Sequence, residues 1–188
     1  MKSPYSFLIT PLNNTRYDNI SKYGDKTLIK STSQEDHTTT NRFGVIKETP
    51  IINHFPSIKK GDTVVLHHNI FRKFYDMKGV EQSGPCHFRD NTYIVDLEQV
   101  YLFKHRDKWN SVGEYCFIRP TVKKEGILLS LEKHEELHGE VVYGNKELES
   151  LGVFNGDKIV FTPESEYEFE IDGEILYRMK TKDVCVSI

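Results

Sequence analysis

Apolar positions along the chain occur in short runs, rich in Val, Ile, Phe and Tyr, that are separated by Gly, Asn, Asp and Pro. This spacing is typical of β-strands joined by turns. The clearest case is Tyr167–Tyr177, where the Asp172-Gly173 pair favours a tight turn with positive φ angles. Alternation before that turn predicts that Phe169 and Ile171 share one face. No segment of about ten residues or more follows the 3.6-residue period of a helix, so the pattern predicts an all-β fold.

The same motifs occur twice along the chain, in the same order. Gly44 and Gly61 are separated by the same number of residues as Gly139 and Gly156. Each first glycine opens an apolar strand pattern, and each second glycine begins a Gly-Asp turn. The flanking motifs match as well: Ser6–Pro11 with Tyr115–Pro120, and Asp96–Phe103 with Met179–Val186. Matching features in one order indicate a tandem duplication.

The two copies predict two domains, residues 1–108 and residues 109–188, each folded as a small β-barrel. Their boundary falls in the charged stretch Lys104–Gly113, which holds the only tryptophan, Trp109. The first copy is longer than the second, and we place the extra residues in an insertion at about 69–90.

Each copy also contains a polar segment, within Leu12–Phe43 in the first copy and Thr121–His138 in the second. Segments of this composition bury too little apolar surface to offset the entropy of ordering them, so we expect mobile loops. Each one nevertheless carries an apolar cluster, Leu28-Ile29 in the first copy and Ile127-Leu128-Leu129, after Gly126, in the second. Because exposed apolar clusters mark interaction sites, these residues are candidates for binding a partner.

The order of these motifs resembles the GroES-type co-chaperonins, the lids of the barrel-shaped chaperonins. In the second copy the resemblance is carried by Phe117–Pro120, Gly126–Leu129, Gly139–Val142, Gly156–Phe161, Ile171–Glu174 and Asp183–Val186. The first copy keeps the same frame more loosely, because no glycine directly precedes Thr27-Leu28-Ile29. Tandem lids are similar to the double-domain co-chaperonins of chloroplasts, although the Asn-, Lys- and Tyr-rich composition equally suits a bacteriophage gene.

The resemblance implies two tandem GroES-like barrels, each with a long mobile loop and a roof hairpin, at Glu48–Lys59 and Gly144–Asn155. It also implies a homo-oligomeric ring that caps the apical domains of a GroEL-type chaperonin and assists protein folding. The implied chaperonin-binding residues are Gly126, Ile127, Leu128 and Leu129, with Leu28 and Ile29 as the first-copy candidates. The family's rings are sevenfold, which pairs of barrels do not divide, and the better-preserved motif favours the second copy as the engaging half.

Other interpretations stay open at these positions. Ile127–Leu129 and Leu28-Ile29 also fit strands of a core. The first roof segment, with Ile51, Ile52 and Phe55, is less polar than a solvated hairpin tip, which leaves room for a lining or partner contact. The alternative function is a structural protein, such as a virion or assembly component, that reuses the tandem barrels as a scaffold.

Two further patterns suggest chemistry but carry less weight. His67, His68, Cys86 and His87 are residue types that bind zinc, but adjacent residues on a strand point to opposite faces, so we expect no metal. Asn69–Tyr75 interleaves aromatic and cationic side chains, as proteins that bind single-stranded nucleic acid do. With only two cations present, a strand with one buried aromatic face is the better interpretation.

Composition narrows the function classes. The 188-residue chain has a net charge of −3, so the basic excess of a nucleic-acid-binding protein is missing. No apolar run approaches the roughly 20 residues of a membrane helix, and the first residues lack the apolar core of a signal peptide. Three distant cysteines do not suggest a disulfide framework. With no recognisable catalytic motif, we expect a non-enzymatic protein without cofactor or metal, located in the cytoplasm, or in the host cytoplasm for a phage protein.

Overall fold

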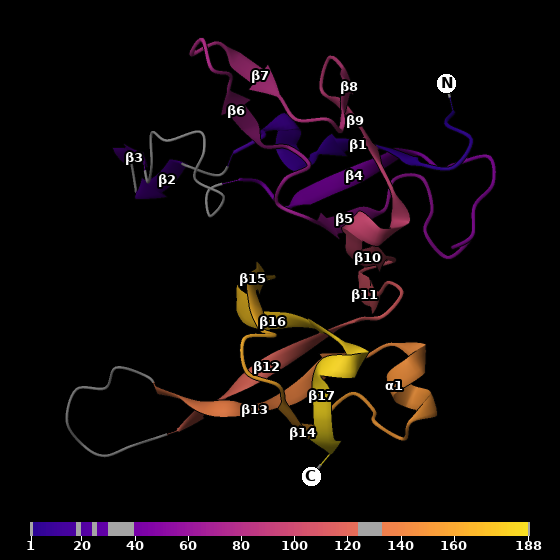
Figure 1. Cartoon of the computed structure of the whole chain (residues 1–188), viewed down its shortest axis with the longest axis vertical. Helices are drawn as coiled ribbons and strands as arrows, with labels where there is room; N and C mark the ends of the chain where they lie inside the picture. Colours follow the sequence, from indigo (N-terminus) through magenta and orange to yellow (C-terminus); the bar gives the residue numbers. More distant parts are fainter. Residues whose placement is uncertain (1, 18–19, 24–25, 30–39, 124–132, 188) are drawn as a thin grey trace. The chain divides into compact units, whose positions relative to one another are not determined.

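The computed structural model describes residues 2–17, 20–23, 26–29, 40–123 and 133–187. The chain divides into two compact units, Met1–Lys108 and Trp109–Ile188, which we call unit 1 and unit 2 and describe separately. Both units are built from antiparallel strands (Figure 1), which confirms the predicted all-β class. Across the described residues, no helix is long and apolar enough to cross a membrane.

The described residues of unit 1 form ten strands, most of them short. They are β1 (Phe7–Pro11), β2 (Ile20–Tyr23), β3 (Lys26–Ile29), β4 (Phe43–Glu48), β5 (Thr63–Leu66), β6 (Lys73–Tyr75), β7 (Glu81–Ser83), β8 (His87–Arg89), β9 (Thr92–Val95) and β10 (Val100–His105). Two short 3₁₀ helices, η1 (Leu12–Asn14) and η2 (Leu97–Gln99), follow β1 and β9. The strand β11 (Lys108–Ser111) spans the boundary between the units.

The main sheet has seven strands in the order β11-β10-β5-β4-β1-β9-β8, of which β11 spans the boundary between the units, and β2–β3 and β6–β7 form separate two-stranded sheets. Its core is built from the inward positions of neighbouring strands. Ile9, Ile46, Val64 and Leu102, one from each of four strands, are at most 1% exposed. Burying such side chains contributes about 1.5–3 kcal/mol each to the stability of the unit.

Unit 2 is smaller, and its described residues form one sheet and one short α-helix. Its elements are β12 (Tyr115–Lys123), β13 (Lys133–Tyr143), α1 (Lys146–Ser150), β14 (Lys158–Phe161), β15 (Tyr167–Ile171), β16 (Glu174–Lys180), the 3₁₀ helix η3 (Thr181–Asp183) and β17 (Val184–Ser187). The strand order is β15-β16-β12-β13-β14-β17. Its core cluster consists of Cys116, Ile118, Val141, Leu148, Val153, Ile159, Phe161 and Met179.

The two units share one strand order. Written in the opposite direction, the sheet of unit 2 is β17-β14-β13-β12-β16-β15, and each strand corresponds in turn to β10, β5, β4, β1, β9 and β8 of unit 1. The register agrees too, because Pro11 pairs with Gly44 as Pro120 pairs with Gly139. The motifs that repeat in the sequence therefore lie on equivalent strands.

The repeated glycines occupy equivalent crowded positions. A Cβ atom at Gly44 would lie 2.5 Å from Ile9 Cγ2, and one at Gly139 would collide with Ile118 and lie 2.7 Å from the carbonyl oxygen of Arg119. Close approach of β1 to β4, and of β12 to β13, thus requires a residue without a side chain.

The hairpin predicted at Tyr167–Tyr177 is confirmed as β15–β16. Asp172 and Gly173 have φ angles of 51° and 84°, as a primed two-residue turn requires. Phe169 and Ile171 are both buried, as predicted from alternation. The four glutamates that alternate near this strand, Glu164, Glu166, Glu168 and Glu170, are exposed.

The predicted roof hairpins are wrong in both units, although their residues are all described. Between β13 and β14 the chain forms α1, because the Asn145 side chain accepts a 2.9 Å hydrogen bond from the Leu148 backbone N–H and caps the helix. Leu148, placed in a polar-looking stretch, is 1% exposed and belongs to the core.

The corresponding connection of unit 1 contains no strand beyond Glu48 until β5 begins. It is held by the N-terminal segment instead. The backbone N–H groups of Ile51 and Ile52 donate to the carbonyls of Ser3 and Pro4, at 3.0 and 2.9 Å. These bonds replace the cross-strand pairs that a hairpin would have made.

Within the described residues neither large sheet closes on itself, and β15 and β17 are the edge strands of unit 2. The prediction of an all-β fold is therefore confirmed. Closure into barrels remains a prediction.

Candidate partner-binding segments

The residues predicted to bind a partner are only partly within the described structure. Gly126, Ile127, Leu128 and Leu129 lie outside the described residues. Leu28 and Ile29 belong to β3, which pairs with β2 in a hairpin in which Ile29 is opposite Ile20 and Leu28 is opposite Ser21. Their backbone is therefore in a strand of the separate β2–β3 sheet, and their role in binding a partner stays a prediction.

Both candidate segments occupy the same place in the topology. Residues 18–39 fall between β1 and β4, and residues 124–132 fall between β12 and β13, the equivalent pair of strands. The two strand pairs that these connections join share an equivalent close pairing, Pro11 with Gly44 in unit 1 and Pro120 with Gly139 in unit 2.

In unit 2 the candidate segment joins the ends of a long antiparallel ladder. β12 and β13 stay paired beyond Gly139 as far as Val122 with His134 and Lys123 with Lys133. Figure 1 shows these two strands running together away from the rest of the sheet.

A charged group lies beside the start of this ladder. Arg119 on β12 forms ion pairs with Glu140 on β13, at 3.1 Å, and with Glu174 on β16. The hydrogen bond to Glu174 raises the pKa of Arg119 above its ordinary value. All three side chains are about two-fifths exposed, so solvent screens the pairs and their contribution to stability is small.

In unit 1 the corresponding position is closed by polar contacts, which we call the neck and define as Arg16, Tyr17, Thr40 and Asn41. Tyr17 and Thr40 form an isolated antiparallel bridge. The buried Asn41 side chain donates to the carbonyls of Leu12 and Thr15, at 3.1 and 2.8 Å, and its backbone N–H donates to the carbonyl of Arg16. Both sides of the first candidate segment are thus tied together at its base.

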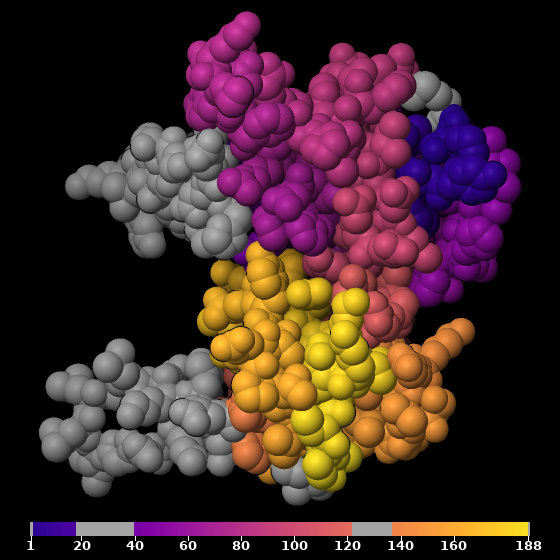
Figure 2. Space-filling view, in the orientation of Figure 1, coloured from indigo at the N-terminus to yellow at the C-terminus, as the bar shows by residue number. Residues whose placement is uncertain are grey.

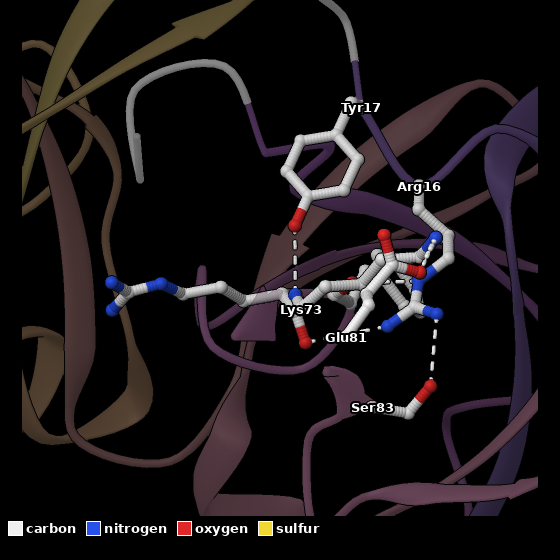
Figure 3. Close-up of polar contacts among 7 residues, drawn as sticks. Arg16, Tyr17, Lys73, Glu81 and Ser83 are labelled. Atoms are coloured by element: carbon white, nitrogen blue, oxygen red, sulfur yellow. Dashed lines mark hydrogen bonds and ion pairs between the residues drawn. The ribbon is translucent and has the colours of Figure 1, made fainter. Parts of the chain in front are cut away.

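The neck also contacts the insertion of unit 1 (Figure 3). The guanidinium of Arg16 donates to the carbonyl of Phe71 at 2.8 Å and to Ser83 Oγ at 3.1 Å. The Tyr17 hydroxyl accepts a 2.7 Å hydrogen bond from the backbone N–H of Lys73. These contacts join parts of the chain more than 50 residues apart, and no local sequence pattern indicates them.

The insertion predicted at about 69–90 contains the hairpin β6–β7, which we call the insertion hairpin. Its turn is ordered by Asp76, whose Oδ1 accepts from the backbone N–H groups of Lys78 and Val80, at 2.9 Å each. These bonds lower the pKa of Asp76. Figure 2 shows the insertion standing out at the surface of unit 1.

The insertion hairpin carries exposed apolar side chains. Phe74, Tyr75 and Val80 are 43%, 45% and 53% exposed, and Met77 is fully exposed. The expectation of a strand with one buried aromatic face is wrong for β6, because the buried aromatic residue is Phe71, two residues before the strand begins. The second exposed group lies on the connections that replaced the roofs: Ile51 and Ile52 in unit 1, Leu151 and Phe154 in unit 2.

The histidine and cysteine residues do not form a metal site in the part of the chain that is described, where no group of three or more potential ligands comes together. His67 and His68 follow β5, and their rings stack with centroids 4.3 Å apart. The expectation that a strand would turn them to opposite faces is therefore wrong. His87 Nε2 contacts the carbonyl of Asp90 at 2.8 Å, and burial raises the pKa of Cys86.

Compared with known proteins, the chain matches no family model and no curated protein.

Proposed function

We propose that the chain is a co-chaperonin: a ring-forming lid that caps a GroEL-type chaperonin through the apolar residues Ile127, Leu128 and Leu129, preceded by Gly126. Leu28 and Ile29 are the corresponding residues of the first copy. Each unit is then a GroES-like barrel. The protein acts without enzymatic activity or cofactor, in the cytoplasm, and binds neither nucleic acid nor membrane.

The observation that carries this proposal is the common placement of the two apolar segments. Each segment connects the same pair of strands, in units with the same strand order and register. A duplicated scaffold that carries an apolar cluster twice at one topological position is suited to presenting several weak contacts to one partner.

The energetics agree with a repeated weak contact. Burying one Ile or Leu side chain contributes about 1.5–3 kcal/mol, most of which is offset when a segment orders as it binds. A ring that presents many copies gains affinity through effective concentration and still releases its partner when the geometry changes.

Self-association has a suitable surface in unit 2. β17 is an edge strand of its sheet, and Val186 on it is 56% exposed. The edge of an antiparallel sheet offers backbone groups that can pair with another chain. A heterologous contact of this kind closes into a ring when the rotation between copies permits it.

The test changes Ile127 and Leu129 to Ser together and measures complex formation with a purified GroEL-type chaperonin and chaperonin-dependent refolding of a client enzyme. We expect binding to weaken at least tenfold, since about 1.4 kcal/mol corresponds to that factor and two side chains are lost. Leu151→Ser is the matched control, because Leu151 is an exposed leucine of the same unit. Unchanged capping by the double variant refutes the assignment.

A second function, a structural component of a virion or other assembly, is favoured by the apolar surface of the insertion hairpin. A symmetric lid does not require Phe74, Tyr75, Met77 and Val80 to be exposed, whereas a neighbouring subunit in a shell would cover them. Electron microscopy of the purified protein distinguishes the two functions. A free hollow ring supports the lid, and a monomer that assembles only within a larger shell supports the scaffold.

A further inference from the structure

We propose that the insertion hairpin is a clamp on the neck of unit 1, which restrains the first candidate segment at its base. The contacts that form it, between Arg16 and Tyr17 on one side and residues 71–83 on the other, are called the neck clamp. The proposal concerns unit 1 alone and does not depend on the identity of the partner.

Arg16 supplies the larger part of the clamp. Its Nε and two terminal nitrogens donate to the carbonyl of Phe71 (2.8 Å), the carbonyl of Arg72 (3.3 Å) and Ser83 Oγ (3.1 Å). The three acceptors lie before β6 and at the end of β7, so one guanidinium holds both ends of the insertion hairpin. The planar fork of arginine suits such a set of acceptors, and lysine cannot reproduce it.

The guanidinium is also fixed from a second side. Its central carbon lies 5.5 Å from the centre of the Tyr93 ring, a cation–π distance. Tyr93 is fully buried and packs edge-on against Phe71, with ring centroids 4.8 Å apart. Arg16 is thereby held between the core of unit 1 and the insertion.

Tyr17 supplies the second contact, one residue further into the segment. Its hydroxyl accepts from the backbone N–H of Lys73, the first residue of β6. Lys73 Nζ pairs with Glu81 across the hairpin at 2.5 Å, which ties β6 to β7. Displacement of Tyr17 therefore disturbs both strands of the insertion hairpin, β6 through the Lys73 backbone and β7 through the Lys73–Glu81 ion pair.

The described part of unit 2 has no counterpart of this clamp. Its equivalent connection, residues 162–166 between β14 and β15, is described throughout and contains no strand. The second candidate segment instead follows the β12–β13 ladder directly. The insertion thus adds a restraint at the base of the segment whose apolar cluster is shorter and lacks a preceding glycine.

Restraint at the base has a binding consequence. Fixing part of a segment before it docks lowers the entropy that docking must offset. The clamp therefore compensates for the weaker apolar cluster of the first copy. This consequence, unlike the clamp itself, rests on the proposed function.

The clamp is tested by hydrogen exchange and mass spectrometry on the full chain, with the variants Arg16→Lys and Tyr17→Phe. We expect exchange in the peptides that cover residues 20–29 to rise about fivefold, the factor that corresponds to one ordinary hydrogen bond. Exchange in β4, β5 and β12 is expected to stay unchanged. Met77→Ala is the control, because Met77 is fully exposed on the same hairpin and outside the clamp.

Exchange that is unchanged at residues 20–29, or that rises equally throughout unit 1, overturns the clamp. If Arg16→Lys fails to fold, Ser83→Ala removes one bond of the same set and is judged by the same peptides. A separate measurement addresses binding. In an Ile127→Ser, Leu129→Ser background, the added Arg16→Lys change should weaken residual chaperonin binding further. If the unaltered chain does not bind, the proposed function is refuted, and hydrogen exchange alone then decides whether the clamp exists.

Discussion

Unit 1 and unit 2 share a strand order. They differ in the connection between two equivalent neighbouring strands, β1 and β4 in unit 1 and β12 and β13 in unit 2. In unit 1 the connection is tied at its base by Asn41 and by the insertion hairpin. In unit 2 the same two strands simply continue as a ladder to Lys123 and Lys133. One strand order thus carries two different bases for this connection: side-chain contacts in unit 1 and a continued strand pair in unit 2.

The comparison shows where a duplicated fold tolerates change. The positions that agree are those where backbones approach each other, such as Gly44 and Gly139, because no other residue fits there. The connections differ because surface segments accept insertions at a modest cost in closure entropy. Differences between the units are therefore where a specialised function is to be sought.

The largest effect confined to one unit is expected from a substitution in the connection between β13 and β14. Leu148→Ala removes a buried side chain from the core of unit 2, and we expect a loss of about 2–5 kcal/mol in the unfolding free energy of that unit. Trp109, the only tryptophan, is the first residue of unit 2, and its Nε1–H donates to Asp172 Oδ2 of that unit at 2.8 Å, so we expect its fluorescence to change when unit 2 unfolds.

The matched control is Leu151→Ala, three residues further along and 68% exposed. It should change the unfolding free energy by no more than about 0.5 kcal/mol. Equal effects of the two variants would contradict the assignment of Leu148 to the core.

The two crowded glycines provide a direct comparison between the units. Gly139→Ala should destabilise unit 2 by about 1–3 kcal/mol, because the new methyl group meets the Arg119 backbone carbonyl, which cannot move aside easily. Gly44→Ala should cost less in unit 1, where the carbonyl of Thr10 is 3.2 Å away and the closest obstacle is the Ile9 side chain. Hydrogen exchange in β13 and in β4 measures the two effects in one chain, and a larger effect at Gly44 would reverse the expected order.

The repeated motifs and the β15–β16 hairpin could be predicted from the sequence because they depend on local composition. Alternating apolar residues and the Asp172-Gly173 turn determine β15–β16, and the equal spacing of Gly44–Gly61 and Gly139–Gly156 marks equivalent strands. Such features can be predicted because the conformational preference of each residue for a strand or a turn depends only on its neighbours in the sequence.

The features that could not be predicted from the sequence depend on long-range contacts or belong to very short elements. α1 is too short to show a helical period, and the only local signal was Asn145 in a position to cap it. Arg16 could not be assigned a role, since its acceptors, two backbone carbonyls and the Ser83 hydroxyl, lie more than 50 residues away. The exposure of Phe74 and Tyr75 was not predicted because aromatic side chains are usually buried. Exposed apolar side chains of this kind are typical of interaction surfaces.

Each unit also buries a weakly acidic side chain, and these groups make stability depend on pH. Burial raises the pKa of Cys116 from 9.0 to about 12. Below pH 9 the thiol is protonated in both the folded and the unfolded chain. Between pH 9 and pH 12 only the unfolded chain loses the proton, so the stability of unit 2 should fall by up to about 1.4 kcal/mol per pH unit.

Cys116→Ala should reduce the loss of unfolding free energy of unit 2 between pH 9 and pH 11, measured by Trp109 fluorescence during urea unfolding at each pH. Tyr93→Phe is the contrast, because burial also raises the pKa of Tyr93 but this residue lies in unit 1. If both changes flatten the Trp109 transition equally, the two units do not unfold separately.

The smallest effect is expected at the charged group beside the β12–β13 ladder. Arg119 joins three strands of unit 2 through Glu140 and Glu174, but all three side chains are about two-fifths exposed. Arg119→Gln should therefore lower the unfolding free energy of unit 2 by no more than about 1 kcal/mol. The loss should shrink further in high salt, which screens exposed charges. Fluorescence of Trp109 during urea unfolding, at low and at high ionic strength, measures both. A loss as large as that of Leu148→Ala would mean that the ion pairs of Arg119 stabilise the start of the ladder strongly, as Arg16 stabilises the neck of unit 1. The contrast between the two connections would then disappear.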